Sequence, residues 1–444
     1  MKRYMDGVLK YLAHWKIYIR IMAKWTGVAL IVGILCGIMG AAFDIGVEMA
    51  TEFRSAHPYM LYCLPLAGLV IVLLYKLMKV EGEGTDKILE EVQKGKGLHF
   101  LLLPSIFVST FLTHLCGGSA GREGAALQMG GTIGFHTARR LKLDDKDLRT
   151  ATMMGMAAFF AALFGTPLAA TVFALEVISV GLIYHAALVP CIMSALIAYG
   201  TSVFIGVSPT RFEVGAPELS VLMMIKVTVL SILCALVSVL FCAVVHEAGY
   251  LFSKYVKNAW IRVLIGAGAI ILLTLLCGNT DYNGAGMNII KLAVEEGTAR
   301  PFAFLMKILF TAITLGSGFK GGEVVPSFFT GAVFGCVVGP FLGIDAGFAA
   351  AVGLVSVFCG AVNCPLASIF LAGELFGGAG LLYFAMACGL SFVFSGYSGL
   401  YSSQRILYSK LKAQYIDVYT NAHHAGEVTE AEKAHPVQTY WEDD

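Results

Sequence analysis

Four apolar stretches of this chain are long enough, or nearly long enough, to cross a lipid bilayer. They are Gly27–Ala42, Met60–Tyr75, Val221–Val245 and Ile261–Cys277. A spanning helix needs roughly 20 apolar residues. Only 14% of the 444 residues are charged, whereas soluble globular chains carry about 25%. The sequence therefore predicts an all-α integral membrane protein.

Other apolar runs are short and bounded by glycine. Leu101–Leu115 lies in the first half of the chain, and Ala303–Leu315 lies in the second. Short, interrupted apolar stretches in both halves are typical of transporters, whose broken helices point their N-termini at anionic cargo near the middle of the membrane. We therefore expect broken helices around a central ion site.

The second half of the chain repeats the first. An offset of 198 residues gives seven identities within one window of 23 residues. The matched pairs include Gly155 with Gly353, Pro167 with Pro365, Glu176 with Glu374, Gly118 with Gly316, and Arg122 opposite Lys320. Two repeats, at about 26–210 and 220–413, predict one membrane domain over residues 26–413. The repeat alone leaves open whether the two halves are inverted.

The stretch Cys116–Gly131 reads CGGSAGREGAALQMGG and contains Glu123. A glycine-rich break followed by a helix start presents unpaired N–H groups and the positive end of the helix dipole. Such a place binds anions without a cationic side chain. An ionised Glu123 can occupy the place of the anion and take up a proton once an anion displaces it. We interpret Glu123 as a gate; a solvated surface loop is the alternative.

The two ends of the chain differ from its apolar middle. Residues 1–25 carry six lysines and arginines among apolar residues, which predicts an amphipathic helix on the cytoplasmic face of the membrane. Residues 414–444 are polar and charged, which predicts a disordered cytoplasmic tail. That tail is too short for a folded regulatory domain. A metal site is the alternative reading of its histidines, which are His423, His424 and His435.

The eleven cysteines occur singly in apolar stretches, and no C-x-x-C is present. The pattern predicts neither a zinc site nor a disulfide framework, so the cysteines are interpreted as packing residues. We expect no cofactor and no metal. The chain has no basic patch with interleaved aromatic residues, so we expect no nucleic-acid partner.

Ionisable residues in apolar sequence are candidate functional residues in a membrane protein. Glu176 and Glu374 recur at the same offset in both halves, which favours structural roles at helix ends. His246 and Glu247 are adjacent but lack the second histidine of a helical zinc-protease motif. An intramembrane enzyme is therefore only a remote alternative.

Several motifs together resemble the CLC family of anion channels and transporters. They are GREG at Gly121–Gly124, GSGFKGGEVVP at Gly316–Pro326, the paired PLA segments, and LYSS at Leu400–Ser403. The resemblance covers roughly Thr26–Lys412. It implies a homodimer in the cell membrane, with one anion pathway per subunit. It also implies an inverted repeat of broken, tilted helices, with both ends of the chain cytoplasmic.

The resemblance also implies the residues of the site. Glu123 would be the external gate and proton carrier, and Tyr401 would line the inner end of the pathway. Three segments would supply the anion-binding groups, with Lys320 as a supporting cation. These groups are Glu83 and Gly84, then Arg122, Gly124 and Ala125, and finally Glu323, Val324 and Val325.

Three departures narrow the resemblance to the fluoride/proton antiporter branch. GEGTD at Gly82–Asp86 stands where chloride-handling members usually read GSGIP. Ala125 replaces a proline, and Val177 replaces a second, internal glutamate of bacterial chloride exchangers. The expected function is export of fluoride in exchange for protons. A chloride or broad-anion CLC transporter or channel is the alternative.

Glu83 conflicts with an anion filter, because a carboxylate there would repel the cargo by several kcal/mol at intermediate dielectric. Three arrangements remove the conflict. Glu83 turns away from the pathway, is protonated, or pairs with Lys320 or Arg122. Alternatively, Glu83 is an acid at a helix start that stabilises the dipole of the following helix.

Overall fold

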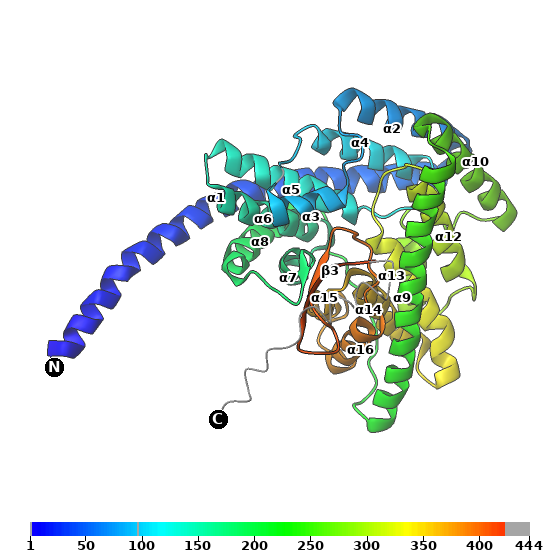
Figure 1. The fold of residues 1–444 in the computed structure, drawn as a ribbon. Coiled ribbons are helices and arrows are strands. Elements are labelled where there is room, and N and C mark those ends of the chain that lie inside the picture. The colour runs from blue at the N-terminus through cyan, green and yellow to red at the C-terminus, as the bar shows by residue number, and fades with distance from the viewer. Residues whose placement is uncertain (1, 96, 422–444) are drawn as a thin grey trace.

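The computed structural model describes residues 2–95 and 97–421 and is mostly helical (Figure 1). The helices of the first half are α1 (Lys2–Ala56), η1 (Pro58–Cys63), α2 (Leu64–Met78), α3 (Thr85–Lys94), α4 (Leu102–Leu115), α5 (Glu123–Arg140), α6 (Asp145–Phe164), α7 (Pro167–Glu176), η2 (His185–Ala187) and α8 (Leu188–Ile205). Those of the second half are α9 (Val221–Tyr255), α10 (Ala259–Cys277), α11 (Met287–Glu295), α12 (Ala303–Gly316), α13 (Val324–Val338), η3 (Gly339–Leu342), α14 (Ala346–Val362), α15 (Pro365–Phe376) and α16 (Leu381–Phe394).

Six helical segments of the described chain are long and apolar enough to cross a membrane. They are Trp15–Ala56, Pro58–Met78, His185–Ile205, Val221–Tyr255, Ala259–Cys277 and Val324–Leu342. Between them lie shorter apolar helices of 10–17 residues, including α4 and α12. The mixture of long and short apolar helices agrees with the prediction of broken helices.

The first helix is longer than the sequence pattern suggests. We predict a separate surface helix over residues 1–25, but α1 continues without a break through residues 25 and 26. Its N-terminal part projects away from the other helices (Figure 1). The placement of this part on the membrane surface stays a prediction.

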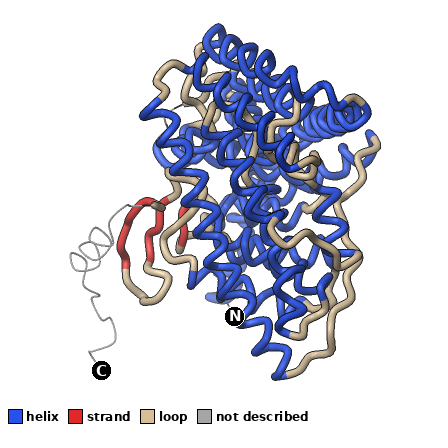
Figure 2. Tube along the Cα trace, turned by 90° about the vertical axis from the view of Figure 1, so that its right-hand side faces the viewer, coloured by secondary structure: helices blue, strands red, loops and turns tan. Residues whose placement is uncertain are grey.

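A small sheet accompanies the predicted helices. Strand β1 (Ser179–Val180) pairs in parallel with β2 (Arg405–Tyr408), which pairs antiparallel with β3 (Tyr415–Tyr419). Val180, Ile406 and Ile416 form a buried apolar cluster on this sheet. The strands lie at one edge of the molecule (Figure 2). Each is only two to five residues long, too short for an apolar pattern to distinguish it from a loop.

The sheet also moves the start of the predicted tail. β3 lies within residues 414–444, so the first residues of the predicted disordered tail form a strand. Residues 422–444 lie outside the described residues, together with the three histidines considered as a metal site.

Local capping signals mark the ends of α6 and the start of α7. The side chain of Asp144 accepts a hydrogen bond from the Asp147 amide at 2.8 Å and caps α6. Gly165 ends α6 in the left-handed conformation, with φ of 66°. Pro167 then starts α7, as is typical of the first helical position.

The offset of 198 holds for the pair α6–α7 and its counterpart α14–α15, but not for the glycine-rich breaks. A Cβ on Gly130 would lie 2.2 Å from the Gly155 carbonyl, and a Cβ on Gly331 would lie 2.2 Å from that of Gly353. Gly155 and Gly353 differ by 198 residues, whereas Gly130 and Gly331 differ by 201. The crossing of α5 with α6 is thus equivalent to the crossing of α13 with α14. The segment between the two contacting glycines is three residues shorter in the second half than in the first.

The changed offset alters which residues correspond. Arg122 is the N-cap of α5, and Glu323 is the N-cap of α13. The pairing of Arg122 with Lys320 in the sequence repeat is therefore wrong. The identities at 198 in this region were too few to reveal a three-residue difference in the following loop.

Glu176 and Glu374 exchange hydrogen bonds between the halves. Glu176 accepts from the amides of Leu366 and Ala367 at 3.2 and 2.9 Å, at the start of α15. Glu374 accepts from the amides of Leu168 and Ala169 at 3.1 and 2.8 Å, at the start of α7. The predicted structural role at helix ends is confirmed. Such reciprocal contacts are what a local two-fold axis produces, so the two halves are related by one.

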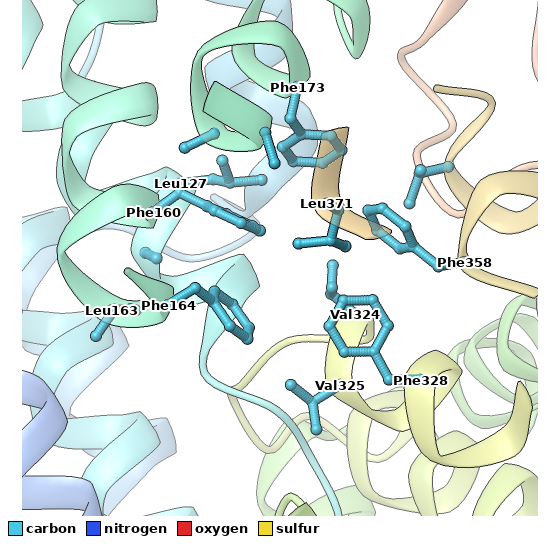
Figure 3. Close-up of a cluster of buried hydrophobic side chains, with 14 of the residues drawn as sticks. Leu127, Phe160, Leu163, Phe164, Phe173, Val324, Val325, Phe328, Phe358 and Leu371 are labelled. Carbon is cyan, nitrogen blue, oxygen red and sulfur yellow. The ribbon is translucent and has the colours of Figure 1, made fainter. Parts of the chain in front are cut away.

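A closed circuit of five phenylalanines fills the space between the halves (Figure 3). Phe160, Phe164 and Phe173 come from the first half, and Phe328 and Phe358 come from the second. Neighbouring ring centroids lie 4.9–6.1 Å apart, in stacked, tilted and edge-on arrangements, which is the spacing that aromatic pairs prefer. Val324 lies beside this circuit, so an apolar seam adjoins the start of α13.

Candidate anion and proton site

The two glycine-rich breaks contact each other directly. Gly121 and Gly322 donate their amides to each other's carbonyls at 2.7 Å, as a single antiparallel bridge. A Cβ on Gly322 would lie 2.4 Å from the amide nitrogen of Gly124, so only glycine at position 322 permits this approach. The bridge brings the starts of α5 and α13 together inside the protein.

Glu123 reaches across this bridge. It is fully buried at the start of α5, and its Oε2 accepts a hydrogen bond from the Val325 amide at 3.3 Å. Its Oε1 has no hydrogen-bond partner among the described residues. The carboxylate of one half thus occupies the N-terminus of a helix of the other half, which is a place that favours negative charge.

The remaining residues predicted for this site differ in environment. Ala125 is fully buried in α5. Val324 is fully buried in the first turn of α13, while Glu323, its N-cap, is only partly buried. Lys320 is partly buried, with its ammonium 4.5 Å from the ring centre of Tyr75.

Arg122 is not free to bind an anion on its own. It forms an ion pair with Asp44 of α1, and both side chains are largely buried. The ion pair ties the start of α5 to the first helix. It also balances the positive charge next to Glu123.

Glu83 pairs with neither predicted cation. It lies in the turn before Gly84, the N-cap of α3, and its Oε1 is 4.0 Å from Nε2 of His99. Its Oε2 is buried without a partner among the described residues. The side chain lines a cavity that it shares with Lys87, His99 and His136. This arrangement corresponds to the alternative in which Glu83 turns away and precedes a helix start.

A hydroxyl from the next turn reaches the break instead. Thr85 Oγ1 lies 3.5 Å from the position of a Cβ on Gly124 and accepts a hydrogen bond from Gln128 of α5 at 3.2 Å. Thr85 is not among the residues predicted from the sequence, because the motif comparison assigns the filter position to Glu83, between the two glycines.

Tyr401 is buried, and its hydroxyl has no hydrogen-bond partner in the part of the chain that the structure describes. The adjoining Ser403 donates its amide and its hydroxyl to Asp86 at 2.8 and 2.7 Å. Tyr401 lies close enough to Asp86, Glu123 and Glu323 for their charges to act on it. The structure therefore brings together the starts of α3, α5 and α13 with this tyrosine.

Comparison with known proteins gives the family. Residues 66–396 match the family model of the voltage-gated chloride channel, which is well over half of the chain. The chain belongs to this family.

Several CLC relatives cover most of the chain. A "Chloride/fluoride channel protein" of Pseudomonas syringae pv. tomato is 35% identical over 398 residues, which are 88% of each chain. An H+/Cl− exchange transporter of Yersinia pestis is 28% identical and covers 78% of this chain and 79% of its own. The solved structure of a CLC-type fluoride/proton antiporter is 32% identical, with a TM-score of 0.83, and covers 86% of this chain and 98% of that one.

A more distant structure shows the same CLC fold. A slow cyanobacterial Cl−/H+ antiporter is 22% identical, with a TM-score of 0.71, over 84% of this chain and 94% of that one. The chain is thus a mostly helical, multi-pass membrane protein with the CLC fold.

Members of the CLC family transport ions and are not enzymes, so the enzymatic alternative is excluded. His246 has a structural environment instead. Its Nε2 lies 2.9 Å from the Gly399 carbonyl and 3.0 Å from the side-chain amide of Asn421. It therefore joins α9 to the segment that carries Tyr401. Across the residues described here, no three His, Cys, Asp or Glu side chains are grouped to hold a metal.

Lys307 is a further residue beside this site, and it is not among the residues predicted from the sequence. It is fully buried in α12 and donates to the carbonyls of Tyr282 and Gly284 at 3.2 and 2.6 Å. The Gly284 amide in turn donates to the Gly118 carbonyl at 2.9 Å. The lysine therefore supports the break that carries Glu123. The feature of the sequence that indicates a role for Lys307 is a single cationic residue within an otherwise apolar helix.

Proposed function

We propose that this CLC protein exports fluoride in exchange for protons. The observation that carries the proposal is the Glu123 carboxylate at the start of α13, bound to the Val325 amide. One group can then occupy the place of the anion when ionised and carry a proton when displaced. Alternate occupation of one position by anion and carboxylate couples the two fluxes.

The choice of fluoride rests on likeness to relatives and on particular residues. The relatives named above include a "Chloride/fluoride channel protein" and a fluoride/proton antiporter. Ala125 and Val177 stand where chloride exchangers carry a proline and an internal glutamate. Fluoride is small and strongly hydrated, so a site for it must replace many water contacts. Backbone amides at helix starts can do so at close range.

The other site residues have supporting roles in this proposal. Gly124 and Ala125 allow the close approach of the two breaks. Val324 and Val325 present the amides of α13 to the anion, and Tyr401 lines the opposite end of the pathway. Glu83 acts as an acid that precedes a helix start and does not bind the anion.

Assembly and orientation complete the proposal. The protein forms a homodimer in the cell membrane, with one pathway in each subunit, as the CLC resemblance implies. Both ends of the chain face the cytoplasm, and the basic residues of the first 25 positions favour this orientation. Cross-linking in lipid tests the assembly, and a chain that stays monomeric in lipid and in detergent contradicts it.

A CLC transporter or channel for chloride or for many anions is the alternative. The experiment is fluoride efflux and chloride efflux from proteoliposomes at matched gradients, with external pH recorded at the same time. Fluoride-selective efflux with opposite proton movement supports the proposal. Equal rates for the two halides favour the alternative.

A further inference from the structure

A cavity of about 570 Å³ ends beside the gate. Its walls come from the second half of α1, the loop after α8, the segment before α11, and the start of α13. Val325 and Arg122 both line it. The Val325 amide binds the Glu123 carboxylate, and Arg122 directly precedes Glu123 in the chain. The inner end of the cavity therefore lies against the gating carboxylate.

One wall of the cavity carries a row of three acidic side chains from α1. Asp44, Glu48 and Glu52 are spaced by four residues along α1 and all line the cavity, since this spacing puts side chains on one helix face. Glu48 and Glu52 are exposed, whereas Asp44 is only 7% exposed. The carboxylates thus lead from solvent to the Asp44–Arg122 ion pair, next to Glu123.

The inner end of the cavity holds a buried histidine. His114 is fully buried and lines the cavity, and its Nδ1 lies 2.8 Å from the Thr110 carbonyl. Nδ1 must therefore carry the hydrogen, which leaves Nε2 of the neutral ring as an acceptor. Nε2 has no partner among residues 2–95 and 97–421.

The charges that face His114 come from three neighbouring helices. Arg54 of α1 donates to the His114 carbonyl at 2.8 Å, and Arg122 and Lys307 lie close enough for their charges to act on the ring. Full burial disfavours a positive charge on the ring, and these cations add to that effect. A neutral acceptor there calls for a hydrogen-bond donor, and so does the unpartnered Oε1 of Glu123. A halide cannot supply a donor, but water can.

We propose that this cavity is the proton entrance to Glu123, in which Glu52 and Glu48 collect protons and His114 orients the innermost water. The proposal rests on the proposed function and names the residues that serve it. Glu48 and Glu52, at the exposed end of the cavity, raise the local concentration of protons there. Ordered water then bridges the buried acceptors. Asp44 neutralises Arg122, so the guanidinium does not repel an arriving proton.

The first test removes the acids. A Glu48→Gln/Glu52→Gln variant should take up protons about tenfold more slowly than the wild type in alkaline, weakly buffered solution, because local proton enrichment is lost. Raising the concentration of a mobile buffer should restore the rate. The matched control is Glu296→Gln, because Glu296 is exposed and does not line this cavity. A variant as fast as the control, or a slow variant that buffer does not restore, overturns the proposal.

The second test addresses His114. His114→Leu should slow proton uptake and leave the fluoride concentration at half-maximal rate unchanged, whereas His114→Gln should retain proton uptake because its amide oxygen still accepts. Equal proton uptake by the Leu variant and the wild type overturns the role of His114. Wild-type protein that moves no protons overturns the proposed function itself, so the two failures are distinguishable.

Discussion

The starts of α5 and α13 are equivalent positions with opposite chemistry. Both follow a glycine-rich break, and the two breaks bond to each other through Gly121 and Gly322. At the N-cap the first half carries Arg122 and the second carries Glu323. At the next position the first half carries Glu123 and the second carries Val324. The two related halves thus supply two helix N-termini. At the equivalent first helical positions only Glu123 carries a carboxylate, and it reaches from α5 to the Val325 amide of α13.

This difference explains how a symmetric frame can perform a directional exchange. The amides of α13 are available because its N-cap residue, Glu323, makes no side-chain capping hydrogen bond. The carboxylate of α5 fills that vacancy when no anion is present. If the first residues of α5 and α13 were identical, the site would hold either two competing carboxylates or none. Neither arrangement exchanges an anion for a proton.

The largest expected effect comes from removing the charge of the single carboxylate. Glu123→Gln should abolish fluoride-driven proton movement, because a neutral amide cannot carry the proton. The measurement is external pH during fluoride efflux from proteoliposomes. Undiminished proton movement in the variant would refute the role of Glu123, and Glu296→Gln serves as the exposed control.

The reciprocal caps give the next largest effect, and they test the symmetry itself. Glu176→Ala should destabilise the protein by about 3 kcal/mol and Glu374→Ala by about 1 kcal/mol, because buried amides left unpaired cost more than partly exposed ones. Glu176 is 6% exposed, whereas Glu374 is only partly buried. Unfolding in detergent measures both. Equal losses would mean that burial does not distinguish the two caps.

The preference between halides should be smaller. We expect fluoride to be favoured over chloride by at least about tenfold, which corresponds to about 1.4 kcal/mol of differential binding. Initial efflux rates at matched gradients measure it. A ratio near one would show that the starts of α5 and α13 do not discriminate by anion size.

The smallest effect is expected at Glu83. Its carboxylate lies toward His99, so Glu83→Ser should leave the halide preference unchanged. Thr85→Val is the informative companion, because the Thr85 hydroxyl is the one beside Gly124. An eroded preference in Glu83→Ser would place that side chain in the pathway after all.

The parts of the fold that depend on local chemistry were predictable from the sequence. Asp144, Gly165 and Pro167 mark helix ends because capping and backbone geometry act within a few residues. The matched positions of Glu176 and Glu374 also indicated their structural role. Glu123 was recognisable because a glycine-rich break, an acid and a helix start are adjacent in the chain.

The remaining features depend on contacts between distant segments. The three-residue change of offset arises in a loop, where the sequence gives no register. The direction of the Glu83 side chain depends on His99 from the following loop, and the role of Lys307 depends on carbonyls of the segment before α11. The strands β2 and β3 are stabilised by pairing, which a pattern of four or five residues does not encode.

The most direct test of the account is a simultaneous record of fluoride and external pH during efflux from proteoliposomes that contain the wild-type protein. A fluoride gradient is imposed without a pH gradient. We predict that protons move opposite to fluoride in a fixed ratio and that the proton signal disappears in Glu123→Gln. Fluoride efflux without proton movement in the wild type would contradict exchange through a single carboxylate.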